Sequence, residues 1–396
     1  MKSVYANYFE IKGSNYEIGF RLGKMISGNP SLIGRLVAET RVISPEGENK
    51  IIMMFDRYCQ GLNEEIQGFS DALNIEKSKI IFYRLTYLAP ACSQIVILPG
   101  LSKNNHTLLA RNYDYRETMD DFCLCKTTVS GKYAHIGTNV MQFGRGEGIN
   151  ECGLAVSQSS CGKPVNNYMG GKKPQIMGLQ FWVVVRTLLE NCSNVEEAIQ
   201  FIDTMPIACN INLILADKSG KAALVEIIDG EKGVDLIHEK SDKKCLMATN
   251  HAHIDTMKKL DPYAIKNSII RYECMEKWIA SNRQVNEDNL KELLLTPYPN
   301  GLMLKYYDDF FGTIKSLIFN LDLGRVNICW GGLNENNWQS FSFSEKFSPM
   351  SLEQQIKKDN TPPDFFALQT IWNDSGIILE SGREMDMDTI TKVEEQ

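Results

Sequence analysis

The chain has 396 residues, of which 43% are hydrophobic and 23% charged, and this balance excludes a disordered or marginally stable protein. Its formal net charge of -7 argues against nucleic acid or an anionic membrane as the main partner, so a small-molecule or peptide-like substrate is expected. The sequence shows neither a signal peptide nor an apolar run of about 18 residues, which predicts a cytoplasmic protein without membrane association. A homo-oligomer is compatible with this composition.

Eleven cysteines stand at irregular spacing, without a Cys-x-x-Cys motif or a paired Cys/His signature. This pattern predicts neither a disulfide framework nor a zinc site, and we expect no metal and no cofactor. Cys123 and Cys125 point to the same face of a predicted strand, which by itself is a weak indication of metal binding. Most of the cysteines are expected to be small buried hydrophobic residues.

The segment 1–91 is predicted to be helical. Ser14 and Glu17 fit a capping box at a helix start. Further along, apolar residues recur at steps of three and four, which predicts one face of a long helix or a helix pair. These residues are Met54, Tyr58, Leu62, Ile66, Phe69 and Leu73. Another helix is predicted to begin at Lys77 or Ser78.

From Cys92 onwards the pattern changes to short runs rich in β-branched and aromatic residues, separated by turn sequences, which predicts antiparallel strands. The runs cover 93–100, 106–115, 133–143 and 153–160, a hairpin over 210–228, and later segments at 245–250, 316–322 and 325–332. The glycine-rich stretch 143–150 is interpreted as a hairpin turn, because it lacks the lysine and the following helix of a phosphate-binding loop.

Helices are predicted over 176–190, from Ser193 with Glu196 in capping-box position, over 265–280 and over 287–295. The chain is polar from about 334, and its end is expected to fray. Strands, then helices, then strands again predict an α+β domain. In this domain two antiparallel sheets lie between two helical layers, an αββα sandwich.

Cys92 is the leading candidate for a nucleophile, since it follows Pro90 at a helix-to-strand boundary where a sheet edge can present a side chain. A buried structural thiol is an equally weighted alternative. A nucleophilic thiol needs a base, and no histidine stands in a setting that marks it, although His251 and His253 form a candidate pair. A free α-amino group titrates near pH 7.7 to 8.0, at about working pH, so a cysteine at a chain N-terminus carries its own base. That alternative requires cleavage before Cys92.

Arg111 and Asp114, three residues apart, are candidates to lower the pKa of a thiol and to hold a protonated amine; a surface ion pair is the alternative. Amides at strand ends can stabilise an oxyanion, although they are also common in turns. Such polar strand ends are Asn150, Gln158, Ser159, Ser160 and Asn250. Arg271 follows an N-cap expected at Ser268, and an arginine at a helix start opposes the helix dipole, which favours a specific partner.

Taken in order, eight segments resemble the acyl-coenzyme A:6-aminopenicillanic-acid acyltransferase-like cysteine peptidases, a family of N-terminal-nucleophile hydrolases related to bile salt hydrolase and penicillin V acylase. The resemblance spans about 9–332. Its segments are FEIKGSNYEIGFRLGK, EEIQGFSDALNI, ACSQ, LLARNYDY, GINECGLAVSQSS, CNINLILADKSGKAALVEI, ATNH and NSIIRYE.

The resemblance implies the αββα N-terminal-nucleophile fold and a precursor that cuts itself between Ala91 and Cys92. A helical segment 1–91 would stay bound to a catalytic core 92–333, on which an extension 334–396 packs. By position, Cys92 would be the nucleophile and its freed α-amine the base. The supporting residues would be Arg111 for the thiolate, Asp114 for the amine, Asn250 and the main chain near Gln158 or Ser159 for the oxyanion, and Arg271 beside the nucleophile.

The expected function is therefore that of an amidohydrolase or acyltransferase that opens a linear amide bond, N-acyl or peptide-like, through an acyl-enzyme. Two alternatives remain open. One is a non-catalytic scaffold with the same fold, and the other is a histidine-dependent cysteine protease that uses His251 or His253.

Overall fold

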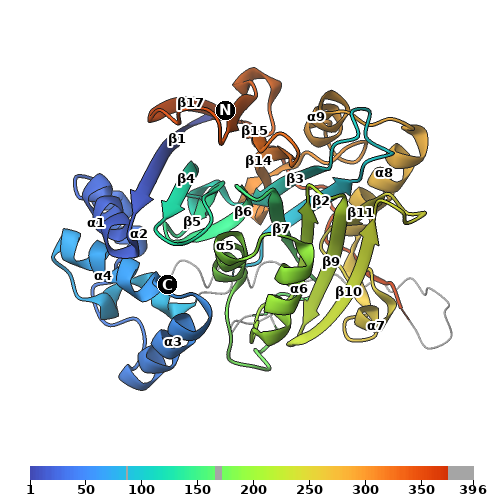
Figure 1. The fold of residues 1–396 in the computed structure, drawn as a ribbon. Coiled ribbons are helices and arrows are strands. Elements are labelled where there is room, and N and C mark those ends of the chain that lie inside the picture. Colours follow the sequence, from blue (N-terminus) through green and yellow to red (C-terminus); the bar gives the residue numbers. More distant parts are fainter. Residues whose placement is uncertain (86–87, 166–171, 373–396) are drawn as a thin grey trace.

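The computed structural model describes residues 1–85, 88–165 and 172–372. Two β-sheets face each other at its centre (Figure 1). The nine-stranded sheet runs in the order β10 (Glu231–His238), β9 (Lys221–Ile228), β8 (Ile211–Asp217), β7 (Leu154–Ser160), β6 (Gly144–Asn150), β5 (His135–Val140), β4 (Cys123–Val129), β1 (Lys2–Gly13) and β17 (Met350–Ile356). Neighbouring strands are antiparallel except β1 and β4, which are parallel.

The seven-stranded sheet runs in the order β11 (Cys245–Ala248), β2 (Ala91–Ile97), β3 (Leu108–Tyr115), β14 (Phe311–Asn320), β15 (Arg325–Trp330) and β16 (Gln339–Ser342), and β13 (Lys305–Tyr306) pairs with β14. β2 packs against β7 and β8 of the other sheet, which joins the two sheets face to face. A small separate sheet contains β12 (Tyr263–Ile265) and β18 (Leu368–Thr370).

Helices cover the outer face of each sheet. α5 (Phe181–Asn191) and α6 (Val195–Thr204) pack on the nine-stranded sheet, while α8 (Lys266–Ser281) and α9 (Glu287–Leu295) pack on the seven-stranded sheet (Figure 1). α7 (Asp255–Lys258) is a single turn beside β9 and β10. The predicted αββα arrangement of an α+β protein is therefore confirmed. No helix in the described ranges is long and apolar enough to cross a membrane.

The prediction that segment 1–91 is wholly helical is wrong at its start. Residues Lys2–Gly13 form β1, an interior strand between β4 and β17, because apolar side chains there pack into the sandwich. The remaining elements are α1 (Asn15–Ile26), α2 (Pro30–Leu36), α3 (Pro45–Tyr58), α4 (Leu62–Leu73) and two short 3₁₀ turns, Lys77–Lys79 and Ile81–Arg84, in place of a third long helix. The capping box of Ser14 and Glu17 is present. Gly61, with φ +86°, separates α3 from α4, so the apolar stripe belongs to a helix pair.

Other boundaries differ by a few residues. α5 begins at Phe181 rather than at 176, and α6 is capped by Asn194, which accepts from the Glu197 amide, rather than by Ser193 with Glu196. The stretch expected to be a turn at 143–150 is mostly strand β6, which pairs with β5, and Gly144 leaves room for Trp182 of α5. Beyond 333, β16, β17 and β18 join the sheets, and the expected frayed end lies outside the described residues. The segment boundaries at 91 and 333 stay a prediction.

Candidate active site

Cys92 is the second residue of β2, and its thiol points between the two sheets. Gln94, on the same face of β2, bonds Ser157 and Ser159 of β7 in the opposite sheet, which shows that this face is the inner one. The thiol is fully buried and lies 2.9 Å from Nη2 of Arg111 on the adjacent strand β3. Burial raises the pKa of the Cys92 thiol, and the Arg111 charge works against that rise.

Arg271 approaches Cys92 from the opposite face of the sheet, on α8. Its Nη1 donates to the main-chain oxygen of Cys92 and to Oγ of Ser93, both at 2.8 Å. Its Nη2 donates to Oδ1 of Asn250 at 2.7 Å and to Oδ1 of Asn267 at 2.8 Å. α8 begins at Lys266, so Ser268 lies inside the helix and the predicted N-cap at Ser268 is wrong. Arg271 therefore projects from the second turn of α8, and its guanidinium is hydrogen-bonded to these four oxygens.

Asp114 lies on the same face as Arg271. One carboxylate oxygen, Oδ1, accepts from Oγ1 of Thr313 at 2.6 Å, and the other, Oδ2, is 3.9 Å from Nη1 of Arg271. Oδ2 has no hydrogen-bond partner within the described part of the chain. Burial raises the pKa of Asp114 to about 6, against the opposing effect of Arg271. Because Asp114 pairs in register with Ala91, this carboxylate stands beside the Ala91–Cys92 bond.

Asn250 follows β11 and reaches the main chain around Cys92. Its Oδ1 accepts from the Cys92 nitrogen at 3.2 Å; this nitrogen is an amide in the unbroken chain and would be an amine after cleavage. Its Nδ2 donates to the main-chain oxygen of Ser160 at 3.1 Å and to Ser160 Oγ at 2.9 Å, and lies 3.5 Å from the Pro90 oxygen. The amide hydrogens of Asn250 thus face the segment that precedes Cys92.

The side chains of Gln158 and Ser159 form no hydrogen bond with Cys92 in the described chain, and the role predicted for the main chain near them stays a prediction. Ser159 Oγ donates to the main-chain oxygen of Thr249 at 2.6 Å and accepts from Gln94. Gln158 points to the other face of β7, where its buried side-chain amide has no partner among the described residues. Ser160, for which the sequence predicts no separate role, lies near the segment before Cys92. Its main-chain nitrogen donates to the Pro90 oxygen at 3.3 Å.

The two candidate histidines are held by other partners. Nδ1 of His251 contacts Ser268 Oγ at 2.8 Å, and His253 Nε2 accepts from the Thr249 nitrogen at 3.3 Å. Burial lowers the pKa of His251 to about 3 and that of His253 well below its usual value. Ser268 Oγ also accepts from the Asn250 nitrogen at 2.7 Å, so His251 supports the loop that carries Asn250. The neutral His251 ring therefore stabilises this loop through Ser268.

Sequence reasoning missed Glu147 on β6. Its Oε2 lies 2.7 Å from Nη1 of Arg111, and both side chains are fully buried. The only signal was an acidic residue within the glycine-rich stretch 143–150, which had been interpreted as a turn. Asn150, by contrast, serves a turn: its Oδ1 accepts from the nitrogens of Cys152 and Leu154.

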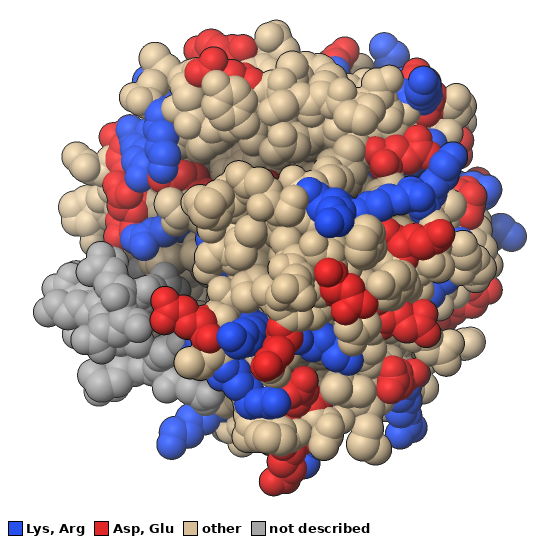
Figure 2. Space-filling view, turned by 90° about the vertical axis from the view of Figure 1, so that its left-hand side faces the viewer, with Lys and Arg blue, Asp and Glu red and all other residues tan. Residues whose placement is uncertain are grey.

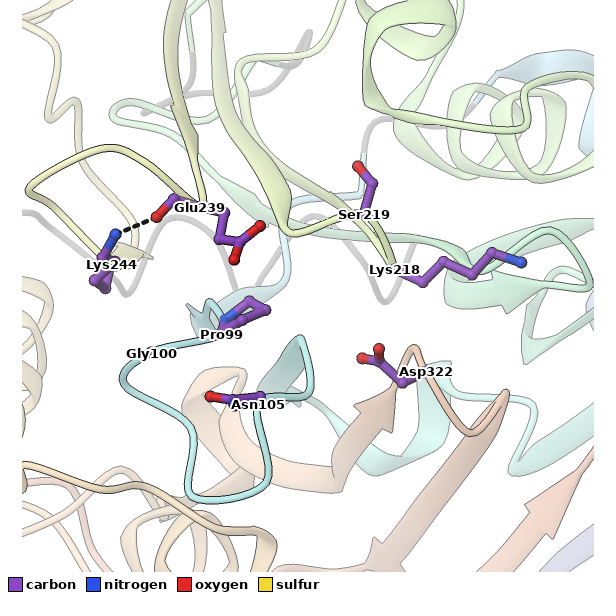
Figure 3. A pocket seen from close by; sticks show the side chains of 8 residues that line it. All are labelled: Pro99, Gly100, Asn105, Lys218, Ser219, Glu239, Lys244 and Asp322. Atoms are coloured by element: carbon purple, nitrogen blue, oxygen red, sulfur yellow. Dashed lines mark hydrogen bonds between the residues drawn. The ribbon is translucent and has the colours of Figure 1, made fainter.

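Two cavities of the described chain lie away from the Cys92 thiol, and the first is at the far end of β2. It has a volume of about 370 Å³ and opens near Pro99 and Gly100, beyond the other end of β2, with Lys218, Ser219, Glu239 and Asp322 around it (Figure 3). At the rise of a β-strand this is roughly 20 Å from Cys92. A second cavity of about 270 Å³ is lined by side chains near Arg271, namely Lys266, Ile270, Tyr298, Pro299, Tyr306, Pro362 and Asp364. Figure 2 shows both signs of charge interspersed on one face, around a largely uncharged hollow in its upper half.

The sequence model of the acyl-coenzyme A:6-aminopenicillanic acid acyl-transferase family matches residues 101–335, a match that begins after Cys92. Among solved structures, penicillin V acylase from Agrobacterium tumefaciens aligns with a TM-score of 0.44 at 17% identity, over 69% of this chain and 99% of that one. A variant of conjugated bile acid hydrolase from Clostridium perfringens aligns with a TM-score of 0.42 at 12% identity, over 69% and 99%. Comparison with curated protein sequences gives no significant match. Because the family model spans more than half of its residues, the chain belongs to the acyl-coenzyme A:6-aminopenicillanic acid acyl-transferase family.

Proposed function

We propose that this chain is the precursor of an N-terminal cysteine amidohydrolase or acyltransferase, which cuts itself between Ala91 and Cys92. One observation carries the proposal: the thiol, the nitrogen and the oxygen of Cys92 are each held by a different buried polar side chain, respectively Arg111, Asn250 and Arg271. Burying two arginines around one cysteine is costly, and a structural thiol has no need of them.

Self-cleavage would begin when the Cys92 thiol attacks the carbonyl carbon of Ala91. The carbon–sulfur bond forms, the Ala91–Cys92 carbon–nitrogen bond breaks, and the thiol proton passes to the departing nitrogen. Water then hydrolyses the thioester, which leaves a carboxylate at Ala91 and a free thiol and amine at Cys92. Nδ2 of Asn250, which lies 3.5 Å from the neighbouring Pro90 oxygen, would donate to the oxyanion formed at Ala91.

In the mature enzyme the α-amine of Cys92 would take the thiol proton, since an α-amine titrates at about pH 7.7 to 8.0. The thiolate attacks the substrate carbonyl, the protonated amine gives its proton to the leaving nitrogen, and water or an acceptor amine releases the acyl group. Asp114, whose Oδ2 lacks a hydrogen-bond partner within the described residues, would hold the protonated amine. Arg271, which bonds the Cys92 oxygen, would keep the new N-terminus in position.

Segment 1–91 would remain bound after cleavage. β1 is an interior strand of the nine-stranded sheet, with both neighbours supplied by the other segment. In addition, the carboxylate of Glu65 on α4 pairs with the Arg186 guanidinium on α5 through contacts of 2.9 and 2.6 Å, and both side chains are buried. Departure of segment 1–91 would remove an interior strand from the sheet and would leave the buried Arg186 guanidinium without its ion pair to Glu65.

The test is the variant Cys92→Ala, which should stay a single chain and turn over no substrate in a panel of N-acyl amides that differ in acyl group and amine. Retained turnover would refute the nucleophile. A scaffold without activity would give an inert wild type that has no new N-terminus at Cys92. A histidine-dependent protease would be inactivated by His251→Ala and His253→Ala, whereas our proposal requires each variant to keep processing once it is folded.

A further inference from the structure

The Arg111 guanidinium joins the two sheets at the nucleophile. On one side Nη2 donates to the Cys92 thiol at 2.9 Å. On the other side Nη1 donates to the Gly146 oxygen at 2.9 Å and lies 2.7 Å from Oε2 of Glu147, both on β6. The Cζ atom also stands 5.0 Å from the centre of the Tyr113 ring. The orientation of the guanidinium over the thiol is therefore set largely by the opposite sheet.

Glu147 is itself fixed. It is fully buried, and its Oε1 accepts a short hydrogen bond from Oγ1 of Thr138 on β5. Its Oε2 forms an ion pair with Nη1 of Arg111 at 2.7 Å, and the same nitrogen donates to the Gly146 oxygen. A fully buried carboxylate is costly unless it is paired, and here the Arg111 guanidinium is its charged partner.

The Glu147 charge affects how readily the Cys92 thiol loses its proton. The charged or titratable groups near Cys92 and Arg111 are Tyr113 of β3 and Glu147 of β6 on the inner face, and Asp114 of β3 and Arg271 of α8 on the opposite face. With Glu147 ionised, the Arg111 pair is neutral, and loss of the thiol proton adds an uncompensated negative charge to a buried site. Without Glu147, the same step would make the Arg111 and Cys92 pair neutral.

We propose that Glu147 is a positioning residue of this site: its carboxylate fixes the Arg111 guanidinium against the Cys92 thiol and offsets its charge, so that the thiol keeps its proton until the α-amine removes it. The inference rests on the proposed function. It explains why Arg111, which stabilises the Cys92 thiolate, is also paired with the Glu147 carboxylate.

The experiment measures how fast p-nitrophenyl acetate acetylates Cys92 in the processed enzyme as a function of pH, by mass spectrometry of the Cys92 peptide, with Cys92→Ala as the blank. In Glu147→Gln the acid limb of this profile should move to lower pH by about one unit, because one opposing charge is lost. In Arg111→Gln it should move to higher pH. Glu147→Asp keeps the charge and should keep the limb near that of the wild type, with a rate about tenfold lower because Arg111 is held less firmly.

Glu65→Gln is the matched control, since it also neutralises a buried carboxylate paired with an arginine, on another part of the sandwich. It should leave the acid limb in place, as a loss of stability alone would. If Glu147→Gln does not fold, Thr138→Val removes the hydrogen bond that fixes the Glu147 carboxylate but keeps its charge, and should lower the acetylation rate with the limb near that of the wild type, as Glu147→Asp does. An unmoved limb in folded Glu147→Gln, or a wild-type acetylation rate in Thr138→Val, overturns the role of Glu147. Absence of any acetylated N-terminal Cys92 in the wild type overturns the proposed function instead.

Discussion

Oδ1 of Asn250 lies 3.2 Å from the main-chain nitrogen of Cys92, although 158 residues separate the two in sequence. The same oxygen accepts from Arg271, and the amide hydrogens of Asn250 face Ser160 and the Pro90 oxygen. Asn250 therefore fixes one side of the bond that we expect to be cut, and it presents donors to the chain before that bond. This relationship underlies the first prediction.

Asn250→Ala should slow both self-cleavage and substrate turnover by about 10² to 10³-fold, the usual effect of removing one oxyanion donor. The measurements are the two-chain fraction against time on denaturing gels and kcat for an amide of the panel. Asn212→Ala is a matched control, because Asn212 donates to the Thr249 and His251 oxygens behind the same loop without approaching Cys92. If Asn250→Ala processes at the wild-type rate, Asn250 has no role at the oxyanion.

The buried histidines predict a loss of stability in acid. His251 stays neutral in the folded chain to about pH 3, while the unfolded chain takes up a proton near pH 6.5. Because the unfolded state binds more protons in this window, the free energy of unfolding falls as pH falls, by about 1.4 kcal/mol per pH unit for this group. The loss begins below pH 6.5 and is complete near pH 3.

Urea unfolding of wild type and His251→Gln between pH 7 and pH 4 measures this effect. The variant lacks the titrating ring, so its stability should decline less steeply than that of the wild type. His238→Gln, a substitution at an exposed histidine, should follow the wild-type curve. Parallel curves for wild type and His251→Gln would show that His251 is not held neutral by the fold.

The buried pair of Glu65 and Arg186 should hold the two segments together. Glu65→Ala leaves the Arg186 charge with Glu190 as its only acidic partner among the contacts of the described chain, and should lower the free energy of unfolding by about 3 kcal/mol. Glu64→Ala, at the exposed neighbouring position, should change it by less than about 0.5 kcal/mol. Urea midpoints and size-exclusion chromatography of processed protein give both readouts. Equal midpoints for the two variants would contradict an anchoring role.

Much of the fold was accessible from sequence because periodicity reports local burial. The 3.6-residue period over α3 and α4 and the apolar runs around Asp217 reflect faces that must pack, whatever they pack against. β1 was missed because its residues show only partial alternation, and its place between β4 and β17 depends on chain 110 residues and more away. Strand pairing at that separation leaves no local pattern.

The candidate site divides in the same way. The residues carried by the resemblance, such as Arg111, Asn250 and Arg271, converge on Cys92 in the structure. Glu147 and Ser160 could not be assigned from the sequence, because their relation to Cys92 arises where the second sheet faces the first. The oxyanion role predicted for the main chain near Gln158 or Ser159 stays a prediction, because the direction of a strand's side chains does not test its main chain.

The central claim is that Cys92 becomes the first residue of the working enzyme. Intact-mass spectrometry of purified wild type, with N-terminal sequencing of each component, tests it most directly. The account predicts two chains, one that ends at Ala91 and one that begins at Cys92, and a single chain of 44.8 kDa for Cys92→Ala. A wild-type protein that turns over amides as one unbroken chain would contradict it.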